Sequence, residues 1–283
     1  MRNILKIFLS FLIAFCTPAA WAAEPPPMLW TNADTMATLY HPVFDFDRDG
    51  CYPSVGIGRN GVYNGGEDRV GAPQSRCRDL SDLDNSNVYS RTRCRTGGGA
   101  WGNRVYCATM FALYFQKDQV LPASACDGCD AAGHRHDVES VIIWTISRDD
   151  WNSDPNNKVI TDVTISQHRD RQTLPATSST IRWWTDASGR NTHPKIVYHK
   201  DGGSTHVLRF GNPSDETIEN HWGRWWLNGL VTWENMSGDG SLNNAAMRNL
   251  FNNPQSGVNY HFNDLSFCGK INGWKPSSFP AIC

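Results

Sequence analysis

The chain has 283 residues, with 26 basic and 28 acidic side chains and nine cysteines. A formal net charge of −2, with no clustered Lys and Arg, does not suit nucleic acid, which is normally bound through a basic face, so we expect no such partner. Charged residues make up only 19% of a chain that is rich in Gly, Trp, Asn and Asp, which is typical of an extracellular β-protein with many loops.

The first 22 residues have the pattern of a secretory signal peptide. A basic start at 1–6 precedes an apolar run at 7–15, and Ala20-Trp21-Ala22 has the form of a cleavage site. A bilayer-spanning helix needs about 20 apolar residues, which is more than this run offers. We therefore expect a secreted protein in which residues 23–283 form one domain. A buried N-terminal helix or an uncleaved anchor is the alternative.

Beyond a proline-rich leader at 24–27, short segments rich in β-branched and aromatic residues alternate with clusters of Gly, Asn, Asp and Pro. The predicted strands are 105–115, 138–146, 159–167, 180–185, 195–198 and 206–210. A helix capped by Ser241 is predicted up to Phe251, and a second short helix is predicted around 222–233. Many short strands and few helices favour a mainly β fold, a sandwich or a barrel.

An acidic segment at 45–50, D-F-D-R-D-G, has the opening of a calcium-binding loop, in which alternate carboxylates converge before a glycine turn. An EF-hand would need Glu eleven positions after Asp45, but Gly56 stands there, which excludes that motif. Two interpretations stay open: a looser calcium loop with Asp45, Asp47 and Asp49 as ligands, or an acidic turn held by the cysteine that follows.

Eight cysteines follow the signal segment, and an even number in an exported chain favours disulfides. Pairing each with its nearest neighbour in sequence predicts the bonds Cys51–Cys77, Cys94–Cys107, Cys126–Cys129 and Cys268–Cys283. Because Cys126 and Cys129 form a C-x-x-C pair, half a zinc site or a redox pair is the alternative for them.

Five ionisable side chains lie together in G-H-R-H-D-V-E at 133–139, directly before an apolar run. On a strand, Asp137 and Glu139 would share one face and His136 would point to the other. Two carboxylates and an imidazole form a ligand set that suits calcium, magnesium or manganese, although two His and one carboxylate also occur at zinc. The alternative is a polar strand edge with ion-paired side chains.

Motifs of nucleophilic enzymes are missing, since the sequence contains no G-x-S-x-G element. The H-x-H-D pattern leaves a secreted metal-dependent hydrolase as a less favoured alternative, with His134, His136, Asp137 and Glu139 at its centre.

The segment at 133–139 closely resembles G-H-R-H-D-W-E, the signature of the necrosis- and ethylene-inducing peptide-like proteins, a secreted cytolysin family of microbes associated with plants. Six of the seven positions match. Further matches to family motifs lie at 50–53, 76–77, 108–118, 141–144 and 192–199.

This resemblance implies a single-domain β-sandwich with a few flanking helices, similar to actinoporins and fungal lectins. It implies a protein that is not an enzyme, binds a divalent cation such as calcium or magnesium, engages sphingolipid headgroups or glycans, and damages target plasma membranes. We expect a monomer. Matched residue by residue, the metal ligands are Asp118, His134, Asp137 and Glu139, and the second shell or cavity holds His206, His168 and His136.

The chain also departs from the family pattern. The signature Trp is Val138 here, and the Trp and Asp of the family's W-P-x-D-H are absent from G-G-S-T-H at 202–206. In the family these residues help to contact the sugar headgroup. A non-toxic carbohydrate-binding protein is therefore the main alternative to a cytolysin.

Overall fold

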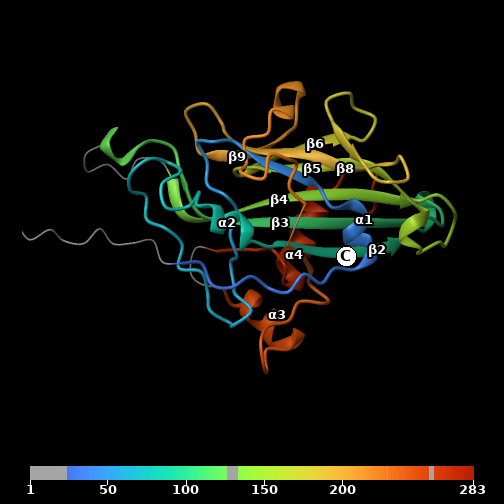
Figure 1. Cartoon of the computed structure of the whole chain (residues 1–283). Helices are drawn as coiled ribbons and strands as arrows, with labels where there is room; N and C mark the ends of the chain where they lie inside the picture. Colours follow the sequence, from blue (N-terminus) through green and yellow to red (C-terminus); the bar gives the residue numbers. More distant parts are fainter. Residues whose placement is uncertain (1–23, 126–132, 228, 255–257) are drawn as a thin grey trace, which may run out of the picture.

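The computed structural model describes residues 24–125, 133–227, 229–254 and 258–283. Two β-sheets lie face to face, and helices α3 (Asn244–Asn252) and α4 (Asp264–Trp274) lie on the outer side of the larger sheet (Figure 1). This arrangement confirms the predicted mainly β sandwich with a few flanking helices. The predicted signal segment at 1–22 and the pair Cys126–Cys129 lie outside the described residues.

The larger sheet has the strand order β10-β2-β3-β4-β5-β6, antiparallel throughout except that β10 runs parallel to β2. Its strands are β2 (Val88–Thr96), β3 (Val105–Gln119), β4 (Gly133–Ser147), β5 (Lys158–Gln167), β6 (Asp170–Pro175) and β10 (Leu230–Thr232). In the smaller sheet β8 pairs with the other three strands. These strands are β1 (Val43–Phe46), β7 (Trp183–Thr185), β8 (Asn191–Lys200) and β9 (His206–Phe210).

The helices are short, and α1 packs against strands of both sheets (Figure 1). They are α1 (Thr35–Tyr40), α2 (Leu80–Asp84), α3 (Asn244–Asn252) and α4 (Asp264–Trp274), with 3-10 turns at Gly99–Trp101, Ala123–Ala125, Pro155–Asn157 and Pro213–Glu216. Within the described residues, no helix has the length and apolar character needed to cross a membrane.

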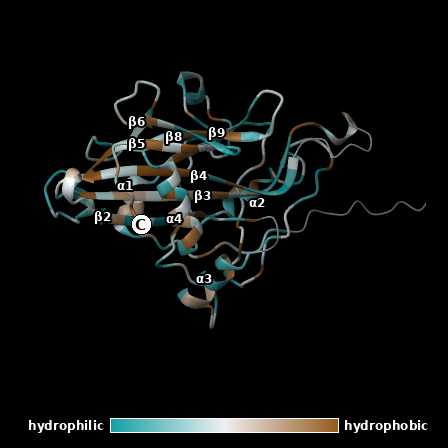
Figure 2. Cartoon of the chain, turned by 180° about the vertical axis from the view of Figure 1, so that it is seen from behind, coloured by the Kyte–Doolittle hydropathy of each residue, from teal (hydrophilic) through white to brown (hydrophobic). Residues whose placement is uncertain are grey.

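Strand β3 separates two hydrophobic cores because its successive side chains point to opposite faces of the sheet. Phe111 packs between the two sheets, whereas its neighbour Met110 packs beneath α3 and α4. All fifteen residues of β3 are buried. Figure 2 shows the hydrophobic residues along the central strands and hydrophilic residues on the surrounding loops.

Each predicted strand is present, and three predicted disulfides are confirmed: Cys51–Cys77, Cys94–Cys107 and Cys268–Cys283. The C-terminal helix is present as α3, but it begins at Asn244 and is capped by Asn243 rather than by Ser241.

The helix predicted around 222–233 is wrong. Gly229 has φ +69°, a left-handed conformation that turns the chain. The β-branched residues after it then pair with β2 as β10, where Val231 lies opposite Tyr89. Long-range pairing thus overrides the local helical spacing.

The packing between the sheets predicts a large loss of stability for Phe115→Ala. Phe115 is fully buried and its ring stacks on Tyr198 of β8, with centroids 3.9 Å apart. Truncation leaves a cavity between the sheets, so the free energy of unfolding in urea should fall by about 3–5 kcal/mol. Leu265→Ala is the control, because Leu265 is 87% exposed and its loss should change little. Equal stability of the two variants would contradict this packing.

Candidate functional site

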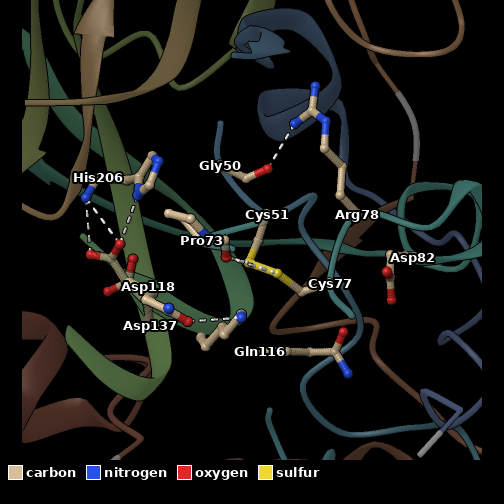
Figure 3. The surroundings of a disulfide bond; sticks show 12 residues. Gly50, Cys51, Pro73, Cys77, Arg78, Asp82, Gln116, Asp118, Asp137 and His206 are labelled. Atoms are coloured by element: carbon tan, nitrogen blue, oxygen red, sulfur yellow. Dashed lines mark hydrogen bonds and ion pairs between the residues drawn. A yellow bond between two sulfur atoms is a disulfide. The ribbon is translucent and has the colours of Figure 1, made fainter. Parts of the chain in front are cut away.

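Four predicted ligands meet at one end of the larger sheet because of the β3–β4 register. Asp118 lies opposite His134, Phe115 lies opposite Asp137, and Glu139 is further along β4. His206 begins β9 of the smaller sheet and reaches this edge from the other side (Figure 3). Residues that are far apart in sequence are thereby brought together.

Asp118 is the most firmly held carboxylate of the group. It is 2% exposed and accepts hydrogen bonds from the backbone N of His206 at 3.0 and 3.1 Å, and from Nδ1 of His206 at 2.8 Å. Nε2 of His206 makes no hydrogen bond within the described residues and lies 3.6 Å from Oδ1 of Asp49. A Cβ at Gly50 would lie 2.9 Å from Cδ2 of His206, so the disulfide-anchored loop needs glycine here.

Asp137 and Glu139 are held less firmly and are electrostatically strained. The Tyr198 hydroxyl donates to Oδ2 of Asp137 at 3.4 Å, and the Ser166 hydroxyl donates to Glu139. Burial, and then the nearby charge of Asp118, raise the pKa of Asp137 to about 7. Burial, and then the charge of Asp137, raise the pKa of Glu139 well above its usual value. Three carboxylates thus share a space that disfavours their combined negative charge.

The two histidines of the motif take different directions. Nδ1 of His134 donates to the carbonyl of His136 at 2.7 Å, which leaves its Nε2 lone pair available, and its positive form would lower the pKa of Asp137. His136 has φ +62°, and its ring lies 2.7 Å from the Tyr114 hydroxyl on the helix-covered face of the sheet. The structure therefore brings His134, but not His136, to the carboxylates.

His168 lies beside the site without touching its carboxylates. Its ring nitrogens are 3.2 Å from the Ser204 hydroxyl and 3.0 Å from the Thr205 hydroxyl, so it braces the turn that leads into His206.

The acidic residues at 45–49 do not converge on one point. Asp45 lies in β1 and accepts hydrogen bonds from the backbone N of Glu219 and Asn220. Asp47 lies 3.6 Å from Arg209, and Asp49 lies towards His206 as described above. The geometry fits a braced acidic turn better than a calcium loop.

Sequence reasoning missed two polar side chains of this site, Ser166 and Lys270. The charges of Glu139 and Asp137 act to raise the pKa of Lys270, but burial outweighs them and lowers it to about 8. Lys270 lies in α4, more than a hundred residues from β4, and no local pattern in the sequence links the two. Tyr198 lies in the predicted strand 195–198, but nothing in that pattern showed that its hydroxyl faces Asp137.

The donor set suits a divalent cation, although it is not prearranged around one. In the part of the chain that the structure describes, no three His, Cys, Asp or Glu side chains are placed as ligands of a single ion. The fit instead lies in the chemistry: buried carboxylates with raised pKa values, and an imidazole nitrogen of His206 without a hydrogen bond. A hard cation would offset the repulsion among these oxygens.

Comparisons with known proteins add three findings. The family model of the necrosis inducing protein NPP1 matches residues 34–274. NLP effector protein Pc107869 of Phytophthora capsici is 33% identical over 52% of this chain, and the match covers 35% of that relative's length. NLP effector protein 3 of Plasmopara viticola is 26% identical over 88% of this chain and 89% of the relative.

A solved structure described as NLPPya in complex with mannosamine has the same fold. Its TM-score is 0.59 at 23% identity, and the likeness covers 88% of this chain and 94% of that one. At this identity the likeness speaks for the fold alone.

The raised pKa of Asp137 predicts a pH-dependent stability cost. An unfolded Asp has a pKa of about 3.9, so between about pH 4 and 7 the folded state keeps a proton that the unfolded state has lost. The contribution of Asp137 to the free energy of unfolding is therefore most favourable below pH 4 and falls as the pH rises to 7. In chelator, Asp137→Asn should become increasingly more stable than wild type across that window, measured as the difference between urea midpoints.

The difference between the urea midpoints of variant and wild type is the useful measure, because the titration of other groups makes stability rise with pH. Burial lowers the pKa of His41 to about 3, which by itself makes stability rise with pH. Asp170→Asn is the control, since Asp170 is exposed on β6. A pH-independent difference for Asp137→Asn would contradict the prediction.

Proposed function

This chain belongs to the necrosis-inducing protein family, and from that premise we propose that it is a secreted, cation-dependent cytolysin or elicitor acting on the plasma membrane of a target cell. Its family is one of toxins and elicitors rather than enzymes, and its curated relatives are effector proteins. The observation that carries the proposal is the meeting of Asp118, Asp137 and Glu139 beside His206 at one end of the sandwich.

The proposed ligands of the cation are Asp118, His134, Asp137 and Glu139, and calcium or magnesium is the proposed ion. Bound there, the ion would supply a positive centre for the hydroxyl oxygens of a glycan. Asp118 would stay oriented by His206, while Asp137 and Glu139 would release their protons and turn from the Tyr198 and Ser166 hydroxyls. Their raised pKa values support this role, because a bound cation would offset the burial and the mutual repulsion that keep these two groups protonated.

The proposed target is a sphingolipid headgroup or a related glycan on the membrane surface. The aminosugar in the complex of a protein with the same fold supports a sugar ligand. The relatives in this family are secreted effectors, which supports the proposal that residues 1–22 are a signal peptide that directs export. We also propose that residues 23–283 form one domain and act as a monomer.

A second candidate function is glycan binding without membrane damage. It is favoured by Val138, which stands where the family signature has Trp and packs partly buried against the helix-covered core. A valine there offers less surface to a headgroup than an indole ring. The turn before His206 likewise carries Ser204 and Thr205 instead of the family's acidic residue.

Membrane damage should depend on the carboxylates. Vesicles that contain a glycosylated sphingolipid and a quenched dye should leak on addition of protein and calcium, and chelator should stop the leakage. Asp137→Asn should slow leakage at least tenfold because it removes one charged ligand, whereas Asp170→Asn should match wild type. Calcium-independent leakage would contradict the cation mechanism, and calcium-dependent attachment without leakage would favour the second candidate.

Cation binding should also stabilise the fold. Calcium at a hundred times its dissociation constant should raise the free energy of unfolding by about 2.7 kcal/mol, since an ion that binds only the native state shifts the folding equilibrium. The shift in thermal midpoint should be lost in Glu139→Gln and kept in Asp170→Asn. Equal shifts in wild type and Glu139→Gln would place the ion elsewhere.

A further inference from the structure

A cavity lies far from the carboxylates of the candidate site. Three tryptophans, Trp184, Trp222 and Trp225, line a space of about 440 Å³ together with Glu216 and Arg224. We call it the tryptophan pocket. Its volume is in the range of small-molecule sites, which are typically lined by aromatic side chains with a few polar groups.

The tryptophan pocket and the carboxylates lie towards opposite ends of strand β8. Trp184 lies opposite His193 near the start of β8, whereas His206 lies opposite Lys200 at its end. Seven residues of strand separate these two positions, which corresponds to roughly 23 Å at about 3.3 Å per residue. A ligand in the pocket would therefore not touch the proposed cation ligands.

Each indole ring of the pocket is held in place by the protein. The indole N–H of Trp225 donates to Oε2 of Glu216 at 3.3 Å, and that of Trp222 donates to Oδ1 of Asp84 at 2.6 Å. The ring of Trp184 leans on His193, with centroids 5.1 Å apart. Rings fixed in this way bind a ligand without losing rotamer freedom.

The charge of the pocket is positive. Oε1 of Glu216 is already shared by Lys195 at 2.7 Å and Arg182 at 3.2 Å. The guanidinium of Arg224 stacks over Trp222 at 4.8 Å, and within the described residues it has no hydrogen bond or ion pair. With Asp84, which accepts from the indole of Trp222, three cations stand against two carboxylates, and the donors of Arg224 remain for a ligand.

Another cavity borders the tryptophan pocket at Trp222. This ring and Leu227 also line a neighbouring space of about 450 Å³ that extends to His41 and Leu230.

These features together fit an acidic sugar. The C–H groups on one face of a pyranose ring carry partial positive charge and pack against the negative face of an indole. A guanidinium binds a carboxylate or phosphate through two parallel hydrogen bonds. We propose that the tryptophan pocket is a second glycan-binding site, which takes a pyranose unit bearing a carboxylate or phosphate, with its ring on the tryptophans and its acid group on Arg224.

This site is independent of the proposed cation. It would give the protein two points of attachment to one glycan-covered surface, so that the second contact adds to the strength of the first. The acid group could belong to a free saccharide or to the headgroup of a glycolipid, and the experiment below separates these sources.

Calorimetric titration with glucuronate and with glucose 6-phosphate, in chelator, tests the proposal. Wild type should bind both and should not bind neutral glucose detectably. Arg224→Gln should weaken binding at least tenfold, and Arg224→Lys should restore part of it. Vesicles that carry an acidic glycolipid should compete with the free sugars if the headgroup is a source, and vesicles without sugar should not.

Two control variants make the result specific. Arg171 is a matched arginine elsewhere, because its guanidinium also lies over an indole ring, 6.0 Å from that of Trp274. Asp162 and Asp170 lie beside it, so it is a poor site for an acid group. The Arg171→Gln variant should therefore bind the sugars like wild type. Asp137→Asn should also bind normally. No binding by wild type, equal loss in Arg171→Gln, or loss in Asp137→Asn with binding kept in Arg224→Gln would each overturn the proposal. The proposal would also be overturned if the protein bound sugar-free vesicles through these tryptophans and bound no sugar.

Discussion

The hydrogen bonds between Asp118 and His206 tie the two sheets together at the edge where the candidate site lies. Asp118 is the last residue but one of the long central strand β3, and His206 begins a strand of the opposite sheet. Both residues are 2% exposed, so these contacts are shielded from water. The disulfide-bonded loop at Gly50 closes over His206 and leaves no room for a side chain. This junction fixes Asp118 beside Asp137 and Glu139, which the register of β3 and β4 brings to the same edge.

The same junction creates the tension that makes the site suitable for a cation. A carboxylate fixed at Asp118 acts on Asp137 and Glu139, and the fold buries all three instead of letting them spread into solvent. Burying like charges costs stability unless protons or a cation neutralise them. The carboxylates that would bind the cation therefore lower the stability of the cation-free protein, and a bound cation would remove this cost. The tryptophan pocket shows no such tension, because its charged groups already pair around Glu216, with Arg224 as the exception.

Much of this could be predicted from the sequence where the signal is local or tied to a motif. Strand β9 was predicted to the residue because its pattern is β-branched and bounded by turn residues, and three disulfides join cysteines that are neighbours in sequence. Asp118 was found through family resemblance, since nothing in the spacing alone links it to Asp137. Features that depend on contacts between distant parts of the chain could not be predicted in this way. Strand β10 forms by pairing with β2, which no local pattern shows. Lys270 lies in a helix remote in sequence from β4, and it is linked to Glu139 and Asp137 by the effect of their charges on its pKa. Alternation did place the ring of His136 on the face opposite Asp137.

We propose that a divalent cation takes the place of protons among the buried carboxylates. Calorimetric titration of calcium near pH 6.5, repeated in buffers with different heats of ionisation, measures the protons released for each ion bound. Because the pKa of Asp137 is about 7 and that of Glu139 is well above its usual value, we expect release of about one proton or more per ion. A variant with both residues changed to their amides should release none. Binding of calcium without proton release, or the same release from the doubly changed variant, would contradict it.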